Sequence, residues 1–472
     1  MAIFYNAGET KKRPGVYQRH TNVGFTADSA AQDGICAIPV QASWGPLGKV
    51  VKNTQMSDLE KNYGVGAYAA GHTVPAAAAM FEGGASTVYT YRLGTGGKEA
   101  TKELATGVTV TAKYPGTMPI SVAVQAKLGD TTKKLFHVYT GKALVETWEF
   151  NADGAAEGAN LVAATAASQY VVVTGTAAEV PVLAVATGAL TGGENPTVAN
   201  TDYSAAFAAL EPYYYNTIAL DVDEDENMTL GLMLQSYLDN AYRMGKLGIA
   251  VLGEKTSVAF ATRCTHAKAF NDAKVVYLGG GWKSGTESKD GVMAICYTAG
   301  VIASTPSNQG ITHTAVTGAT DLCEALTYAQ YEEAIDAGML MVSLSTDGTI
   351  WYDSGITTLV TPDDVTQDAG WKKIRRVKVR FELIDRLDHV LAPKVGKVSA
   401  DSDGIADIVQ AGQRVLDQMA NSEGKLHTGA TFKEDPANPY TGDSAWFIIQ
   451  ADDIDSLEKI YLQYQFRYSQ VS

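Results

Sequence analysis

Short apolar runs and helical stripes alternate at the start of the chain. A β-type run, GICAIPVQASWGP at residues 34–46, ends in a Trp-Gly-Pro turn, and a brief helix is predicted over residues 56–63. A helix over residues 76–81 leads through Gly83-Gly84 into residues 86–92, which are rich in β-branched and aromatic side chains and predict a strand. These elements predict the beginning of an α/β unit.

The pattern changes between about residues 94 and 193. Here Val- and Thr-rich runs are separated by Gly, Asp and Asn turns; the runs are VTVTA, ISVAV, FHVYT, VETWEF and YVVVTGT. Short strands separated by turn residues are typical of all-β domains. We therefore predict an inserted β-sandwich or β-barrel domain, whose role stays open.

Helical periodicity returns after Gly192-Gly193. From Leu230 to Met244 the apolar residues follow the i, i+4, i+7, i+8 stripe of an amphipathic helix. Residues 248–252 and 275–278 are predicted buried strands, and residues 292–303 form a further apolar segment. Strands thus alternate with helices as in an α/β layer, and the insert interrupts that layer.

The C-terminal part predicts a small α+β domain. A basic segment is predicted as a strand with one charged face, because Ile374, Val377 and Val379 are interspersed with its charges; the basic residues are Lys372, Lys373, Arg375, Arg376, Lys378 and Arg380. A helix bearing Ile408, Val415, Leu416 and Met419 follows, and then a strand over residues 446–450.

Both ends of the chain are predicted to be extended arms. Near the N-terminus a polar lead is followed by a short extended segment, which Pro14 keeps from being helical: Pro14, Gly15, Val16 and Tyr17. Near the C-terminus apolar and other residues alternate strictly, which predicts a strand with one face formed by Ile460, Leu462, Tyr464, Phe466 and Tyr468. Such a strand pairs either within its own domain or with the sheet of a neighbouring subunit.

Length and composition fit a multidomain globular protein. The chain has 472 residues, 46% of them hydrophobic and 19% charged, so two to four domains are expected. The 24 tyrosines indicate much β structure or much interface. The predicted division has five parts: an N-terminal arm (residues 1–22), a discontinuous α/β core (residues 23–93 and 194–362), the insert (residues 94–193), a C-terminal α+β domain (residues 363–454) and a C-terminal strand arm (residues 455–472).

Net charge and the lengths of the apolar segments argue against nucleic acid and membranes as direct partners. The formal charge of −15 argues against broad binding to nucleic acid, whose phosphates require clustered Lys and Arg. The single strong basic cluster, residues 372–380, is either a solvated edge or a site for an acidic protein surface. No signal-peptide-like segment opens the chain and no stretch approaches the ~20 apolar residues that span a bilayer. We expect synthesis in the cytoplasm and no direct membrane insertion.

Recognisable catalytic, nucleotide and metal motifs are not found. The Gly-rich segment at Gly94 lacks the spacing and the Ser or Thr of a P-loop. The acidic run starting at Asp221 resembles an EF-hand loop, but Glu226 and Leu232 stand where Gly and a bidentate Glu are needed. The seven histidines are scattered, and the four cysteines, without CxxC spacing, are expected to be buried free thiols. We predict no enzyme activity, no cofactor and no metal.

Three stretches along the chain resemble the tail sheath family of contractile phages. The first is Pro14 to Tyr17 with GICAIPVQASWGPLGKV at residues 34–50, and the second is AGVIASTPSNQGITHTAVTGA at residues 299–319 with YEEAIDAGMLMV and GITTL after it. The third is KKIRRVKVRFELIDRL followed by VGKV. Each is weak alone, but their order and spacing match the family.

This resemblance implies a structural subunit. Members form a helical homo-oligomeric sheath around an inner tail tube protein, on a baseplate and below a terminator, and the sheath contracts to drive the tube through a cell envelope. It implies terminal arms that join neighbouring subunits, and we predict that the basic strand faces the tube. Whether the particle is a phage or a headless bacteriocin stays open. The alternatives are a surface-layer or adhesive structural protein and, less favoured by the residues, a cytosolic α/β hydrolase or transferase.

Overall fold

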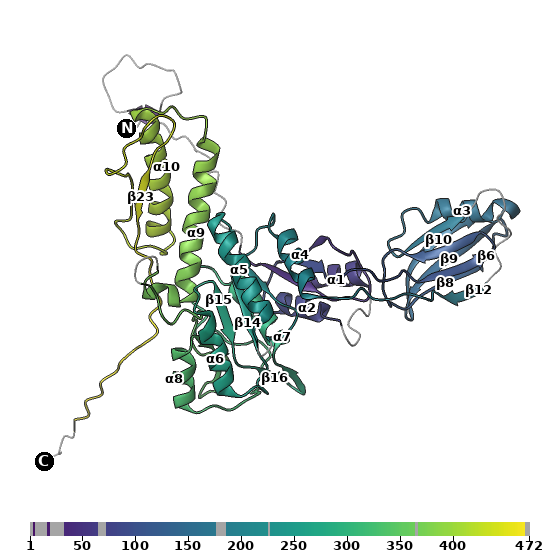
Figure 1. Ribbon diagram of the computed structural model, residues 1–472, viewed down its shortest axis with the longest axis horizontal. Helices are drawn as coiled ribbons and strands as arrows, with labels where there is room; N and C mark the ends of the chain where they lie inside the picture. The colour runs from purple at the N-terminus through teal and green to yellow at the C-terminus, as the bar shows by residue number, and fades with distance from the viewer. Residues whose placement is uncertain are drawn as a thin grey trace.

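The computed structural model describes residues 3–4, 17–18, 33–64, 72–175, 186–224, 227–363 and 367–467. The chain is a multidomain protein of mixed α/β structure (Figure 1). A central α/β part carries a β-rich insert on one side and a helical C-terminal part on the other, and the C-terminal tail leaves the body as an extended segment.

A seven-stranded sheet forms the centre, in the order β19-β15-β14-β13-β3-β5-β4. Strands from before the insert pair with strands from after it, and all neighbours run parallel except β4 with β5. The strands are β3 (Ile35–Val40), β4 (Val50–Asn53), β5 (Thr87–Arg92), β13 (Thr217–Ala219), β14 (Ile249–Gly253), β15 (Val275–Leu278) and β19 (Met339–Leu340). The insert therefore interrupts one α/β layer, as the hydrophobic pattern predicts.

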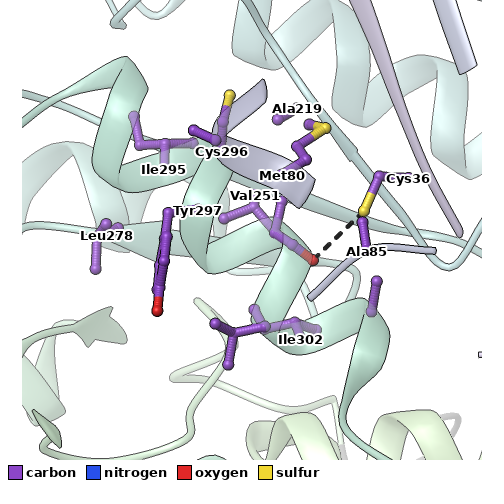
Figure 2. Packing of buried hydrophobic residues seen from close by; sticks show 14 of the residues in the cluster. Cys36, Met80, Ala85, Ala219, Val251, Leu278, Ile295, Cys296, Tyr297 and Ile302 are labelled. Carbon is purple, nitrogen blue, oxygen red and sulfur yellow. Dashed lines mark hydrogen bonds between the residues drawn. The ribbon is translucent and has the colours of Figure 1, made fainter. Parts of the chain in front are cut away.

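Helices cover both faces of this sheet, which explains why its strands are apolar on both sides. One face packs on α1 (Met56–Tyr63), α2 (Val74–Glu82) and α7 (Val292–Ser304). The other packs on α4 (Asn200–Leu210), α5 (Thr229–Arg243), α6 (Phe260–Phe270) and α8 (Tyr328–Asp336). Figure 2 shows part of the first core, in which Met80 of α2 and Cys296 and Ile302 of α7 share one apolar cluster with Cys36 and Val251 of the sheet.

Helices α2 and α7 cross at two glycines. A Cβ atom at Gly300 would lie 2.1 Å from the carbonyl oxygen of Met80, and one at Gly83 would lie 2.1 Å from that of Tyr297. Neither backbone can approach the other so closely with any larger residue at these positions. The crossing explains how α7 becomes buried along almost its whole length.

The insert consists of two sheets that enclose one core. The four-stranded sheet has the order β10-β9-β8-β12 and the three-stranded sheet the order β11-β7-β6. Neither sheet closes on itself within the described residues, so this part of the insert is not a barrel. The elements are β6 (Thr101–Ala105), β7 (Val108–Ala112), β8 (Ile120–Ala126), β9 (Lys133–Thr140), β10 (Ala143–Asn151), η1 (Gly154–Ala156), α3 (Glu157–Ala164), β11 (Val171–Gly175) and β12 (Ala186–Ala189).

Arg92 and Trp44 fasten the insert to the central part. The guanidinium of Arg92 is fully buried and donates to the carbonyl oxygens of Ala42 at 3.0 Å, Gly45 at 2.8 Å and Pro115 at 2.8 Å. Trp44 enters the core of the insert and stacks on Tyr170 with ring centroids 5.1 Å apart. The junction is thus packed and hydrogen-bonded rather than a bare linker.

The C-terminal part is built on α9 (Ile374–Leu391) and α10 (Ser402–Asn421), with a hairpin of β22 (Thr431–Glu434) and β23 (Phe447–Gln450). Helix α9 is shared: Ile374, Val377 and Phe381 pack into the central core, whereas Leu387 packs with α10. The prediction of a basic strand over Lys372 to Arg380 is therefore wrong. The apolar positions 374, 377 and 381 follow the helical spacing i, i+3, i+7, and this stripe decides the structure.

Smaller elements complete the described chain. Two antiparallel pairs and one added strand lie beside the central sheet: β16 (Trp282–Ser284), β17 (Glu287–Lys289), β18 (Asp321–Leu322), β20 (Val342–Leu344) and β21 (Ile350–Tyr352). Near the N-terminus β1 (Ile3–Phe4) pairs in parallel with β2 (Tyr17–Gln18). Two 3-10 turns, η2 (Ala369–Lys372) and η3 (Ala392–Lys394), flank α9.

Candidate assembly interface

The first residue of the acidic run, Asp221, and three of the four cysteines are buried in the fold. Asp221 is buried and accepts hydrogen bonds from the hydroxyls of Thr73 and Tyr203, both at 2.6 Å. Burial is the main cause that raises the pKa of Asp221, and these hydrogen bonds oppose it. The cysteines are free, three of them buried and Cys323 partly so, which confirms the prediction for Cys36, Cys264 and Cys296.

The described ranges contain no group of three or more His, Cys, Asp or Glu side chains that could hold a metal ion. Within the same ranges, none of the helices combines the length and the apolar character that a membrane crossing needs. The surfaces that stand out chemically are instead at the C-terminal end of the chain.

The C-terminal tail, residues 459–467 of the described chain, exposes its apolar side chains. Ile460 is 71% exposed, Leu462 69%, Tyr464 72% and Phe466 94%. The tail extends away from the body and is not assigned as a strand (Figure 1). The predicted strand is therefore not formed in the described part of the free chain, and its last apolar residue, Tyr468, lies outside the described residues.

Just before the tail, residues 451–458 form a segment that we call the strap. The strap runs along the first half of α9, and Asp453 is its most buried acidic residue. Both carboxylate oxygens of Asp453 contact Arg376, with the Nη2 to Oδ1 distance at 3.0 Å, and Arg380 Nη2 donates to Oδ1 at 2.9 Å. These two guanidinium groups hold the pKa of Asp453 below its ordinary range although burial raises it.

The far end of the strap is bound in the same manner. Lys373 makes an ion pair with Glu458, and Thr312 donates its hydroxyl to the other oxygen of Glu458 at 3.0 Å. Arg375 Nη1 donates to the hydroxyl of Ser456 at 3.0 Å. The strap thus reaches from the C-terminal hairpin to the loop that contains Thr312, in the central part of the chain.

These contacts show where the six basic residues predicted from the sequence lie and what they bind. Lys373, Arg375, Arg376 and Arg380 bind the strap, whereas Lys378 lies on the buried side of α9, against the end of α7. Lys372 ends η2. The six residues do come from one segment, but they form no continuous charged strand face, and the predicted contact with an inner tube stays a prediction.

The β22–β23 hairpin, which packs beside α10, offers strand edges in the C-terminal part. Within the described residues each of its two strands pairs only with the other. Ile448 and Ile449 of β23 are 40% and 42% exposed, and Trp446 just before the strand is 46% exposed. Unpaired edges beside exposed apolar side chains can accept an added strand.

The N-terminal arm is described only in part. Tyr17 pairs with Ile3 in the β1–β2 pair, whereas Pro14, Gly15 and Val16 lie outside the described residues. The predicted role of these four residues in linking subunits stays a prediction.

Comparison with known proteins gives a family model and full-length relatives. Residues 197–354 match the model of the phage tail sheath protein central domain. Two proteins of Bacillus subtilis (strain 168), the phage-like element PBSX protein XkdK and the uncharacterized protein YqbK, are each 24% identical to this chain. Each of these alignments covers 97% of this chain and 98% of the relative.

Solved structures share the fold over almost the whole chain. A sheath tail protein from Listeria innocua is 20% identical, with a TM-score of 0.69 over 90% of this chain and 96% of that chain. A sheath tail protein from Desulfitobacterium hafniense is also 20% identical, with a TM-score of 0.69 over 94% and 100%. The helical sheath of the anti-feeding prophage in its contracted state gives 13% identity and a TM-score of 0.53 over 97% and 99%.

Proposed function

We propose that the chain polymerises into a helical sheath that contracts. The premise is that residues 197–354 match the central domain of phage tail sheath proteins, which confirms the resemblance found in the sequence, and that a phage-like element protein is a relative over almost the whole chain. The sheath surrounds an inner tail tube protein, stands on a baseplate, is closed by a tail terminator protein, and drives the tube through the target envelope. The family is structural rather than catalytic. The particle is a phage tail or a phage-tail-like particle, and its subunits are made in the host cytoplasm.

The exposed tail is the observation that carries this proposal. Four large apolar side chains at positions 460, 462, 464 and 466 are each at least 69% exposed in the free chain. Their alternation places them on one face of an extended backbone, which is the pattern of a strand buried on one side. A segment with this pattern, and with no strand partner among the residues that the structure describes, is suited to pairing with another copy.

A strand edge of the β22–β23 hairpin is the acceptor that we propose for this tail. Added to an edge, the tail would gain main-chain hydrogen bonds, and its apolar face would cover exposed side chains such as Ile448 and Trp446. Because donor and acceptor are different surfaces of the same chain, the contact is head-to-tail, and repetition of it generates a helical polymer unless the rotation closes.

Contraction then requires that subunits move while they stay linked. A tail that is bound in the neighbour and extended at its root allows such movement, because the link does not depend on one fixed orientation of the two bodies. No nucleotide motif was found in the sequence, so we propose that the energy is stored in the extended lattice and released as larger interfaces form.

Cysteine cross-linking between two chains tests the acceptor. One chain carries Leu462→Cys and the other Ile448→Cys, both with Cys323→Ser because Cys323 is the native cysteine that is not buried. We expect a disulfide-linked dimer when the two chains are mixed under oxidising conditions. Pairing Leu462→Cys with a cysteine at exposed Leu128 in the insert gives the matched control. Equal yields in the two mixtures would contradict the proposed acceptor.

A further inference from the structure

The strap joins two bodies of the fold, beginning after β23 and ending against the central part. At its start the amide of His427 donates to the carbonyl oxygen of Asp452 at 2.8 Å, and the amide of Ile454 donates to that of Lys425 at 3.0 Å. At its end Glu458 accepts from Thr312, and a Cβ atom at Gly310 would lie 3.0 Å from the hydroxyl of Ser456. The strap therefore spans the junction beside α9.

Charge, rather than apolar burial, holds the strap in place. Of its two large apolar side chains, Leu457 is 82% exposed and Ile454 is only partly buried. Its side-chain contacts are made by Asp453, Asp455, Ser456 and Glu458, and their partners are mainly the basic residues of the first half of α9. Besides the two main-chain hydrogen bonds at its start, the strap is bound through a few charge-assisted hydrogen bonds, so removal of one central charge weakens its attachment.

Asp453 is that central charge. Its side chain is 6% exposed and lies between Arg376 and Arg380, which are 24% and 16% exposed. Arg380 also stacks its guanidinium over the ring of Trp371, at 4.7 Å from the ring centroid, and contacts Asp368. Arg380 is thus held by other contacts as well, whereas the hydrogen bonds that Arg376 donates go to Asp453, which supplies the negative charge between the two guanidinium groups.

We propose that residues 451–458 form a releasable lock, in which the ion pairs of Asp453 with α9 and of Glu458 with Lys373, just before α9, tie the C-terminal hairpin to the central part and fix the point where the tail begins. Release of the lock frees the tail root from the loop at Thr312 and lets the tail leave the body in a new direction. The lock belongs to the free subunit and goes beyond the proposed sheath function. Its failure would leave that function standing.

Amide hydrogen exchange of the purified full chain, followed by mass spectrometry or NMR, tests the lock. We expect Asp453→Asn to raise the exchange rates of the amides of Ile454 and Ser456, which donate to Lys425 and Asp455, by about tenfold or more, since a charge-assisted hydrogen bond is lost on each side of the carboxylate. Asp452→Asn is the matched control: it removes the same charge one residue away, from an exposed side chain. The control should leave these rates unchanged.

A second variant keeps the test decisive if Asp453→Asn disturbs folding, which circular dichroism would reveal. Glu458→Gln removes the ion pair with Lys373 at the far end and should raise the exchange rate of the Ser456 amide while leaving the amide of Ile454 protected. Unchanged exchange in both variants would overturn the proposal. So would an Asp452→Asn variant that opens the segment as much as Asp453→Asn does.

Discussion

Lys378 should make the stability of the chain depend on pH in the alkaline range. Its side chain is 8% exposed, and its ammonium group donates to the carbonyl oxygens of Ile302, at 2.7 Å, and Thr305, at the C-terminal end of α7. Burial is the largest cause that lowers the pKa of Lys378, to about 8, and the charges of Asp33 and Glu382 oppose it. In the unfolded chain the pKa returns to its ordinary value of 10.5.

The sign and the size of the effect follow from these two pKa values. Between pH 8 and pH 10.5 the folded chain has released the proton of Lys378, whereas the unfolded chain still holds it. The unfolded state thus binds more protons, so the free energy of unfolding rises with pH across this window. At about 1.4 kcal/mol for each pKa unit, the rise is on the order of 3 kcal/mol.

Denaturant unfolding at about pH 7 and about pH 10 measures this rise. Lys378→Met removes the titrating group, and Lys397→Met, at an exposed position, is the matched control. Apart from the replaced lysine, the titrating groups are the same in all three proteins, so the quantity of interest is the difference between wild type and each variant. We expect wild type to gain stability relative to Lys378→Met as the pH rises, and not relative to Lys397→Met. Parallel curves for wild type and Lys378→Met would refute the reasoning.

Two further predictions concern close packing. Gly300→Ala should lower the free energy of unfolding by roughly 1–3 kcal/mol in denaturant titrations, despite the higher helix propensity of alanine, because the added methyl group meets the carbonyl oxygen of Met80. Arg92→Met should cost roughly 3 kcal/mol or more and expose the insert to limited proteolysis near Pro115, since three carbonyl oxygens lose their donor. A stabilised Gly300→Ala or an unchanged Arg92→Met would contradict the respective packing argument.

The central α/β elements could be predicted from sequence because their periodicity is local. The predicted helix over residues 56–63 coincides with α1, and the strand over residues 275–278 coincides with β15. Helix α9 was missed because the segment from Lys372 to Arg380 is short and rich in β-branched residues. Extending the window to Phe381 and Leu387, which also face cores, adds the spacing that favours a helix.

The strap could not be predicted, because its contacts join residues far apart in the chain. Arg376 and Asp453 are separated by 77 positions, and no local pattern pairs them. The alternation from Ile460 onward was a true feature of the sequence, yet the described tail forms no strand, since a strand requires a partner edge. Sequence pattern predicts which face would be buried in such a strand but not which chain buries it.

Electron microscopy of the purified chain at rising concentration, alone and with its inner tube protein, tests the central claim most directly. The account predicts hollow striated cylinders for the full chain, and none for a variant that lacks residues 459–472 but remains folded by circular dichroism. Persistent monomers of the full chain in both samples would contradict the account, and so would cylinders that form equally well without the tail.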